Sequence, residues 1–211
     1  MRRVIQVLFV VIIIILGYLI IESIMEPIRF NQEVETREQA TIDRLIDIRD
    51  AQKAYKDVFK IYTGSFDTLI SFIDTGSFAV VKAIGEIPEE WLDEMGFEKA
   101  REKALKEGVI SRETSHVPVL DSVFYHEFNA DSMRYVPYTE GITFTMSSGK
   151  LLTSSNLTVQ VVEAYALYDD LLNGMDQQLI VNYKDERMKI VGFEGVKFGS
   201  MEEGTLTGNW E

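Results

Sequence analysis

Two histidines and one acidic segment are the parts of this chain whose residue types and spacing suggest catalysis or metal binding. His116 and His126 are the only histidines in 211 residues, and Glu127 follows His126 directly. If residues 125–128 form a strand, adjacent side chains point to opposite faces, so His126 and Glu127 cannot act on one substrate. No HExxH or similar spacing joins either histidine to further metal ligands. We therefore interpret both histidines as solvent-facing or hydrogen-bonded side chains.

The acidic segment is the only candidate for a calcium-binding loop. It reads Asp169-Asp170-Leu171-Leu172-Asn173-Gly174-Met175-Asp176. An EF-hand needs oxygen ligands at its positions 1, 3, 5 and 12. Counted from Asp169, position 3 is Leu171 and position 12 is Ile180, so the EF-hand pattern fails. A less regular calcium loop remains an alternative, while an Asn-Gly turn between two strands is the simpler interpretation.

Other reactive groups are missing from the sequence or lack the required surroundings. The chain has no cysteine, which excludes thiolate chemistry, disulfides and cysteine-ligated metals. No serine lies in a G-x-S-x-G setting, and the glycines near the C-terminus lack the strand and GxxxxGK context of a phosphate loop. We therefore expect no enzymatic activity, no catalytic residues, no cofactor and no bound metal.

An apolar segment near the N-terminus predicts a transmembrane helix. Val4–Ile21 is eighteen residues long and is interrupted early by the polar Gln6. Eighteen helical residues span roughly 27 Å, which is close to the hydrocarbon thickness of a bilayer. We place residues 1–3 outside the membrane and the transmembrane helix at residues 4–25, and we expect one span.

The flanks of this segment predict its processing and orientation. A cleaved signal peptide is the alternative, but no small residues in an A-x-A arrangement follow the apolar stretch. Arg2 and Arg3 precede the segment, and Glu22 and Glu26 follow it. The positive-inside rule then predicts a cytoplasmic N-terminus. We expect the protein to lie in a bacterial inner membrane, with the bulk of the chain in the periplasm.

A long amphipathic helix is predicted at residues 26–64, with Pro27 as a break or first turn, Asn31 as N-cap and Gly64 as its end. Its apolar stripe recurs at steps of three and four residues. The stripe consists of Leu45, Ile48, Gln52, Tyr55, Phe59 and Tyr62, widened by Ile42, Ala51 and Val58.

The remaining sequence predicts a helical connector and then a sheet, so the fold class is α+β. Residues 65–116 form the connector, with short helices near residues 66–73 and 88–108, the second interrupted at Gly96. Residues 117–211 form an antiparallel β domain that packs on the amphipathic helix. Its predicted strands lie at residues 117–128, 132–139, 142–148, 157–168, 177–186 and 187–195, with turns at Glu140-Gly141, Ser148-Gly149, Asn173-Gly174 and Lys184-Asp185.

The charge distribution excludes one class of partner. The formal net charge is −13, and since residues 1–25 contribute +1 through Arg2, Arg3 and Glu22, residues 26–211 carry −14. Such an acidic domain repels nucleic-acid phosphates and anionic headgroups, so nucleic acid is not an expected partner. No small-molecule ligand is evident from the sequence.

The order of elements resembles that of type IV pilins and type II secretion pseudopilins. The stretch DIRDAQKAYKDVFKIYTGSFDTL, residues 47–69, adds a local likeness, with Ala51, Ala54, Tyr55, Gly64, Phe66 and Leu69 at the matching positions. GYLIIE, residues 17–22, has the letters of a prepilin peptidase site. In those families, however, the apolar segment follows the cleavage site, whereas here it precedes Gly17. We therefore expect an uncleaved anchor, with Glu22 at the outer end of the span.

These observations lead to two functional hypotheses. The first is a single-pass, membrane-anchored extracytoplasmic protein with a structural or scaffolding role in an envelope assembly, such as secretion or pilus-like machinery. Its partners would be other proteins or further copies of itself. The alternative is a membrane-tethered sensor, ligand-binding or chaperone domain. An exposed apolar stripe or open sheet edge favours the first, and a closed pocket with converging polar groups favours the second.

Overall fold

The computed structural model describes residues 2–124 and 128–211, with side chains described except at residues 2–5, 79–84 and 111–115. The chain is α+β and separates into two compact units. The first unit comprises Met1–Phe66 and Asp131–Glu211, and the second comprises Asp67–Ala130.

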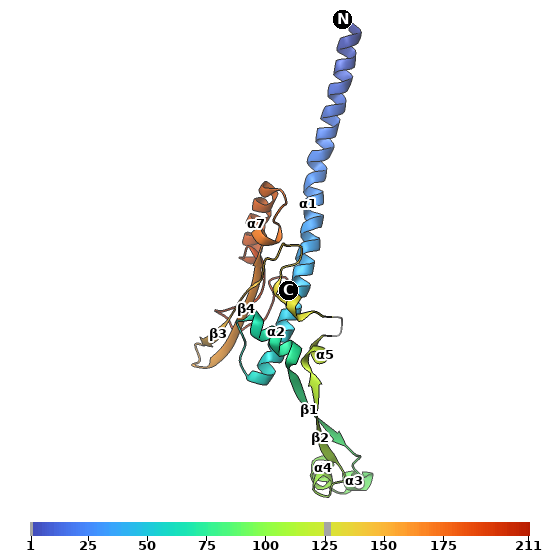
Figure 1. Ribbon diagram of the computed structural model, residues 1–211, viewed down its shortest axis with the longest axis vertical. Helices are drawn as coiled ribbons and strands as arrows, with labels where there is room; N and C mark the ends of the chain where they lie inside the picture. The colour runs from blue at the N-terminus through green and yellow to red at the C-terminus, as the bar shows by residue number, and fades with distance from the viewer. Residues whose placement is uncertain (1, 125–127) are drawn as a thin grey trace. The chain divides into compact units, whose positions relative to one another are not determined.

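A single helix, α1 (Arg2–Phe59), begins the first unit and is 58 residues long. At 1.5 Å per residue its length is about 87 Å. From Gln6 to Arg29 no side chain is buried, and Phe30 is the first buried residue that follows. The N-terminal part of α1 therefore extends beyond the rest of its unit, while the C-terminal part lies against the sheet (Figure 1).

The sheet of this unit has three antiparallel strands in the order β3-β4-β5. They are β3 (Thr145–Leu152), β4 (Thr158–Leu167) and β5 (Gly195–Gly199). Strands β3 and β4 form a hairpin in which Ser148 pairs with Val162, and β4 pairs with β5 through Ala164 and Phe198. The short helices α6 (Tyr168–Leu171) and α7 (Gln177–Val191) join β4 to β5.

The core of the first unit lies between α1 and the sheet. Helix α1 contacts β4 and β5. Leu45 and Ile48 of α1 are completely buried, as are Val162 on β4 and Phe198 on β5. Burying large apolar side chains contributes about 1.5–3 kcal/mol each, so this interface is the main stabilising element of the unit. The prediction of a C-terminal antiparallel sheet packed on the helix is confirmed.

The C-terminal segment lies alongside β5. Gly208 forms an isolated antiparallel bridge with Phe198. The amide of Gly199 donates to the carbonyl of Thr207 at 3.0 Å, and the Asn209 amide donates to the Lys197 carbonyl at 3.0 Å. These bonds use backbone groups that a strand edge otherwise leaves unpaired.

The second unit is built around a two-stranded antiparallel ribbon of β1 (Ser77–Ile84) and β2 (Ser111–Pro118). Between the strands the chain forms α3 (Glu89–Met95) and α4 (Phe97–Lys106), where the buried Ala100 and Ala104 lie on α4. At the other end of the ribbon are α2 (Phe66–Thr75) and α5 (Val119–Val123). The Val119 amide donates to the Gly76 carbonyl at 3.0 Å and connects these two helices.

Several predicted elements agree with this structure. The helix near residues 66–73 is α2, and the interrupted helix at 88–108 is α3 and α4, separated at Gly96. Gly96 has φ +76°, in the left-handed region that glycine adopts without a steric penalty. Strand β4 coincides with the predicted strand at residues 157–168.

The prediction of strands at residues 177–186 and 187–195 is wrong, because residues 177–191 form α7. The side chain of Asp176 accepts a hydrogen bond from the Leu179 amide at 2.9 Å and caps the helix. Gly192 ends the helix in the left-handed conformation. These two caps outweigh the β-branched content that indicated strands, and they place the predicted Lys184-Asp185 turn inside a helix.

The connector at residues 65–116 was predicted to be helical, but it contains β1 and most of β2. The predicted strand at 117–128 contributes only its first two residues to β2 and then forms α5. Residues 125–127 lie outside the described part. The 132–139 segment begins in a 3-10 turn, η1 (Ala130–Arg134), and Ser148-Gly149 lies within β3 instead of at a turn.

Helix α1 also differs from its predicted form at both Pro27 and its C-terminal end. The helix continues through Pro27 and ends at Phe59, not at Gly64. A proline inside a helix removes one hydrogen bond and costs about 3 kcal/mol. The Arg29 guanidinium bonds the Glu22 carboxylate at 3.0 Å across this position, as an exposed ion pair. Asn31 is therefore inside the helix and caps nothing.

Candidate functional site: helix α1 and the groups that it holds

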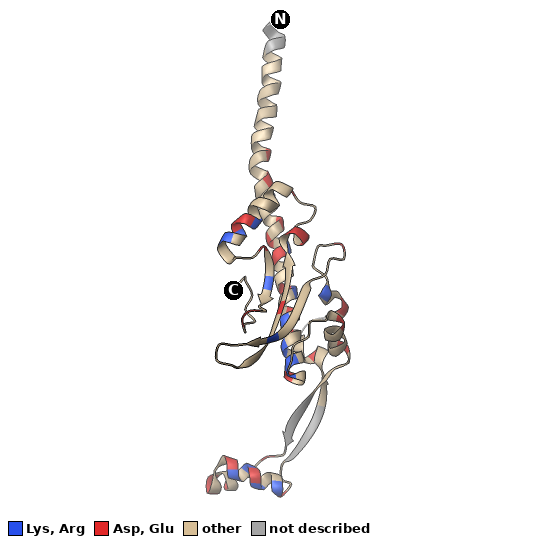
Figure 2. Cartoon of the chain, turned by 90° about the vertical axis from the view of Figure 1, so that its left-hand side faces the viewer, with Lys and Arg blue, Asp and Glu red and all other residues tan. Residues whose placement is uncertain are grey.

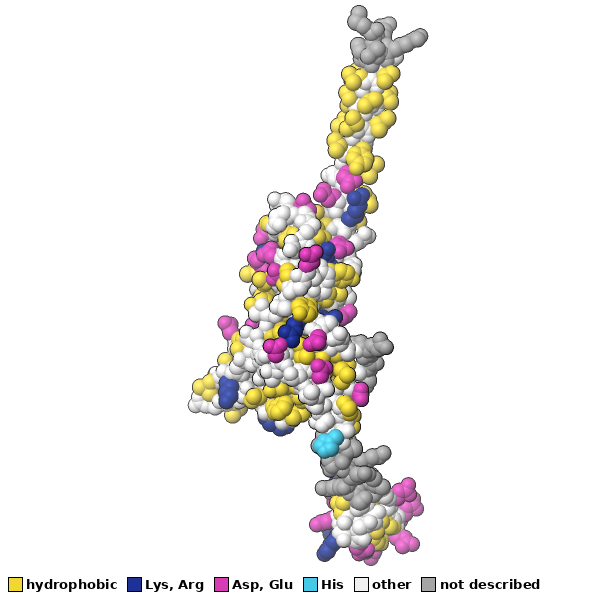
Figure 3. All heavy atoms as spheres, in the orientation of Figure 1, with side chains coloured by type: hydrophobic (Ala, Val, Ile, Leu, Met, Phe, Trp, Pro, Cys, Tyr) yellow, Lys and Arg dark blue, Asp and Glu magenta, His cyan; other side chains and the backbone are white. Residues whose placement is uncertain are grey.

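The N-terminal part of α1 is apolar on every side. Its most apolar 18-residue window has a mean hydropathy of 2.9, and none of it is buried. Figure 2 shows this part of α1 without charged residues, and Figure 3 shows the hydrophobic side chains that surround it. A helix that is apolar around its whole circumference needs an apolar environment on all sides. This long apolar N-terminal helix is consistent with a single-pass membrane protein.

The residues of GYLIIE lie within α1 and are not part of a turn. A Cβ added to Gly17 would meet no atom within 4 Å, so the structure provides no packing reason for a glycine there. Glu22 is partly exposed and pairs with Arg29. Among the described side chains of α1, the first charged pair therefore lies C-terminal to the apolar window.

A network of four polar side chains joins α1 to α6 and α7. The two oxygens of Glu38 on α1 accept hydrogen bonds from Tyr168 Oη at 2.9 Å and from Tyr183 Oη at 2.8 Å. Arg187 donates to Tyr168 Oη through Nε and to Glu38 through Nη2, each at 3.0 Å. The rings of Tyr168 and Tyr183 meet edge to face with their centroids 5.1 Å apart. Each polar group in the network thus has a partner.

The environment of this network keeps both phenols protonated. Burial, followed by the nearby Glu38 carboxylate, raises the pKa of Tyr168 well above its usual value. Burial and the hydrogen bond to Glu38 raise the pKa of Tyr183 in the same direction. A raised pKa makes a phenol a poor general base at neutral pH. The network fits a role in holding α7 on α1 better than a role in proton transfer.

Gln52 of α1 binds the backbone of Thr63, in the segment that follows the C-terminal end of the helix. Its Nε2 donates to the Thr63 carbonyl at 2.6 Å, and its Oε1 accepts from the Thr63 amide at 3.1 Å. Gln52 is completely buried, and Nε2 also lies 3.1 Å from Met146 Sδ on β3. The side chain therefore replaces the backbone partners that a strand or helix would give Thr63.

Three arginines of α1 reach the segments around the sheet. Arg37 Nη1 donates to the carbonyls of Leu171 at 3.1 Å and Asn173 at 3.3 Å. Arg44 donates to Ser132 Oγ at 2.7 Å. Arg49 pairs with the carboxylate of Glu211 and lies 5.9 Å from the ring centroid of Trp210. The three cations lie along α1 and attach separate parts of the chain to it.

The residues that the sequence singled out for chemistry are not brought together. His116 is exposed on β2, and His126 and Glu127 lie outside the described residues. Asp169 pairs with Lys184, which also approaches Glu194 at 3.2 Å. Asp176 instead caps α7. Among the described residues no group of three or more His, Cys, Asp or Glu side chains is arranged to hold a metal.

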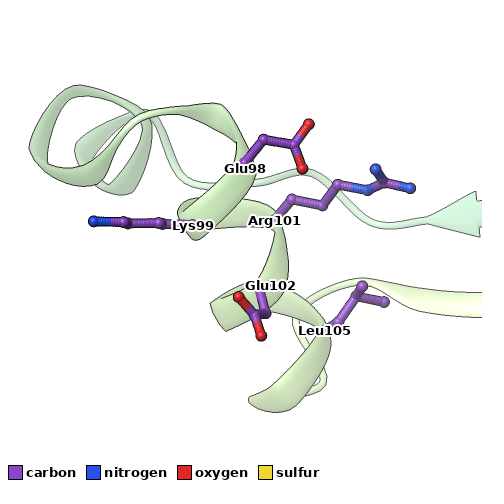
Figure 4. Close-up of a pocket in the computed structure, with 5 residues that line it drawn as sticks. All are labelled: Glu98, Lys99, Arg101, Glu102 and Leu105. Atoms are coloured by element: carbon purple, nitrogen blue, oxygen red, sulfur yellow. The ribbon is translucent and has the colours of Figure 1, made fainter.

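The hollow on α4 has no arrangement for catalysis. It is lined by Glu98, Lys99, Arg101, Glu102 and Leu105, all from one helix (Figure 4). Figure 4 shows Lys99 directed away from Arg101, so the charged ends do not converge on one point. We interpret this surface as the solvated face of an amphipathic helix.

Comparison of the chain with protein-family models, curated proteins and solved structures gives no match.

Sequence reasoning missed the residues that hold α1 to the rest of its unit. Glu38, Tyr183 and Arg187 carry no motif, and the last two were placed in strands. One signal was present: Asp176 and Gly192 bracket 15 residues with the caps of a helix. On that helix Ile180, Tyr183 and Arg187 recur at steps of three and four residues, which places them on one face.

Proposed function

We propose that this protein is a single-pass, membrane-anchored extracytoplasmic protein with a structural or scaffolding role in an envelope assembly of the secretion or pilus-like kind. Residues 4–25 would span the membrane with the N-terminus in the cytoplasm. The membrane would be a bacterial inner membrane, and the acidic remainder would lie in the periplasm. The partners would be other proteins or further copies of this chain.

The observation that carries this proposal is the continuity of α1. The same helix supplies both the exposed apolar segment and the buried face on which β4 and β5 pack. A continuous helix transmits position better than a flexible linker, because it has a fixed rise per residue. An anchor built this way sets the distance between the membrane and the folded unit, which suits a scaffold.

The likeness to type IV pilins and pseudopilins supports the proposal in its general form. As in those families, an apolar helix precedes an amphipathic one that packs on an antiparallel sheet. The position of GYLIIE at the C-terminal end of the apolar segment argues against cleavage at Gly17, since cleavage would leave only Tyr18–Ile21 of that segment.

Two experiments test the proposal. Intact mass and N-terminal sequencing of the protein recovered from membranes should give a chain that begins at or before Arg2 and resists carbonate extraction. A chain that begins at Tyr18 would overturn the anchor. Cross-linking in cells, followed by mass spectrometry, should recover membrane partners or dimers of this chain. Monomeric behaviour without a cross-linked partner would contradict the scaffolding role.

A further inference from the structure

A hollow in the first unit lies between two turns that are distant in the sequence. It has a volume of about 530 Å³ and is open to solvent, since Tyr138 is 60% exposed. One wall is the turn at residues 138–142, and the other is the turn at residues 173–174. The lining residues are Tyr138, Thr139, Glu140, Ile142, Asn173 and Gly174.

Both walls are held by hydrogen bonds that do not involve the lining side chains, apart from that of Thr139. The Val136 amide donates to the Ile142 carbonyl at 2.8 Å and closes the first turn. Thr139 Oγ1 donates to the Val136 carbonyl at 2.7 Å. On the other wall, Arg37 of α1 bonds the carbonyl of Asn173. The hollow is thus formed before any ligand binds, as is usual for ligand sites.

Tyr138 is held in a costly backbone conformation at the rim of the hollow. Its φ is +61°, in the left-handed region that costs a non-glycine residue about 1–2 kcal/mol. Its ring is exposed, so burial of that ring does not compensate for the cost. Unfavourable backbone conformations that persist without a packing gain are concentrated at binding sites.

Three polar groups around the hollow have no partner within the part of the chain that the structure describes. They are the phenol of Tyr138, the carboxylate of Glu140 and the side-chain amide of Asn173. Together they offer a hydroxyl that donates and accepts, a carboxylate that accepts, and an amide that does both. A hollow whose lining combines an aromatic ring with a few polar groups has the composition of a small-ligand site.

We propose that this hollow binds a saccharide, with the Tyr138 ring against the apolar face of a sugar and Glu140 and Asn173 bonding its hydroxyls. Sugar hydroxyls both donate and accept, which matches the carboxylate of Glu140 and the side-chain amide of Asn173 in the lining. An aromatic side chain with a polar tip supplies contact area at low conformational cost. An organic cation fits less well, because cages for such ligands use several aromatic rings and Tyr138 is the one ring in this lining.

This inference does not depend on the membrane anchor, and its test uses the full chain. The protein would be held in a polyoxyethylene detergent, because detergents with sugar headgroups would compete for the site. Chitotetraose and cellotetraose would be titrated by calorimetry, and tetramethylammonium would be titrated in parallel. We expect at least one of the two saccharides to bind and tetramethylammonium not to bind.

Variants of Tyr138 separate binding from folding. Tyr138→Gly removes the ring and also relieves the left-handed strain, so it should weaken saccharide binding at least tenfold while melting no lower than the wild type. Asn173→Ala should weaken binding severalfold, and Tyr138→Phe should retain most of it. Tyr135→Ala is the matched control, because Tyr135 is an exposed neighbour outside the lining and its loss should leave affinity unchanged.

Three results would overturn the proposal. The first is failure of both saccharides to bind at millimolar concentration. The second is equal saccharide affinity in the wild type and in Tyr138→Gly. The third is binding of tetramethylammonium without binding of either saccharide, which would assign the hollow to cations.

Discussion

Gln52 forms two hydrogen bonds with the backbone of Thr63, one from Nε2 to the carbonyl at 2.6 Å and one from the Thr63 amide to Oε1 at 3.1 Å. Both groups of Thr63 are thereby paired at a point where the chain has left α1 and has not yet entered α2. Because Gln52 is completely buried, an apolar side chain of similar size in its place would leave both groups of Thr63 without a partner.

Gln52→Leu should therefore destabilise the first unit. The substitution leaves the amide and carbonyl of Thr63 unpaired, and a buried unpaired group costs about 1–3 kcal/mol. We expect a loss of about 2–5 kcal/mol, measured by urea unfolding of the full chain in detergent micelles. Gln39→Leu is the matched control, since its bond to Asp43 is exposed. A loss below 1 kcal/mol for Gln52→Leu would show that the two bonds are not important.

The raised pKa values of Tyr168 and Tyr183 predict a dependence of stability on alkaline pH. In the unfolded chain these phenols lose their protons near the ordinary pKa of 10.0, whereas the folded chain holds them to higher pH. The stabilisation is therefore complete below pH 10 and decreases as the pH rises above it. The variant Tyr168→Phe/Tyr183→Phe should show a shallower decrease in urea midpoint between pH 9.5 and 11.

The control for this titration is Tyr135→Phe, which removes one exposed phenol outside the network. Its alkaline slope should match that of the wild type. If the double variant keeps the full wild-type slope, other groups dominate the alkaline transition and the prediction is wrong.

Acid should weaken the contact between Arg49 and Glu211. The hydrogen bond from Arg49 lowers the pKa of Glu211 below its usual 4.5. The contribution of this pair is thus present above pH 4.5 and is lost as the pH falls through the lower folded pKa. Glu211→Gln should be less stable than the wild type at pH 7 and equally stable near pH 2. High salt should narrow the difference at pH 7, because Glu211 is exposed. A difference that persists at pH 2 would point to a cause other than charge.

A charge in the apolar part of α1 should weaken membrane association. Ile13 is 66% exposed and lies within the apolar window. An aspartate near the centre of a membrane helix costs about 2.5–3.5 kcal/mol for insertion. Ile13→Asp should increase the fraction released by carbonate, measured by flotation of the membranes. Val58→Asp, at an exposed apolar position of the same helix outside that window, should not. Equal retention of both variants would contradict the assignment of residues 4–25.

The sequence alone determined the elements whose signal is local. The apolar segment is recognisable from composition, because eighteen residues almost free of polar side chains have no stable place in water. The predicted stripe matches the buried face of α1 at Leu45, Ile48, Gln52 and Tyr55, because a helix repeats every 3.6 residues irrespective of its partner. It is wrong at Val58 and Phe59, which are exposed at the C-terminal end of the helix. The sequence also marked Gly96 as an interruption of the helix at residues 88–108, and Gly96 separates α3 from α4.

Only the tertiary structure decided the rest, because those features depend on residues far apart in the chain. Residues 177–191 contain four β-branched side chains that favoured strands, yet their caps and the contacts of Tyr183 and Arg187 with Glu38 make them a helix. Strands β1 and β2 pair across an intervening helical pair, so no short turn marked them. The hollow beside Tyr138 also forms only when residues 138–142 and 173–174 come together, since spacing along the chain carries no information about that proximity.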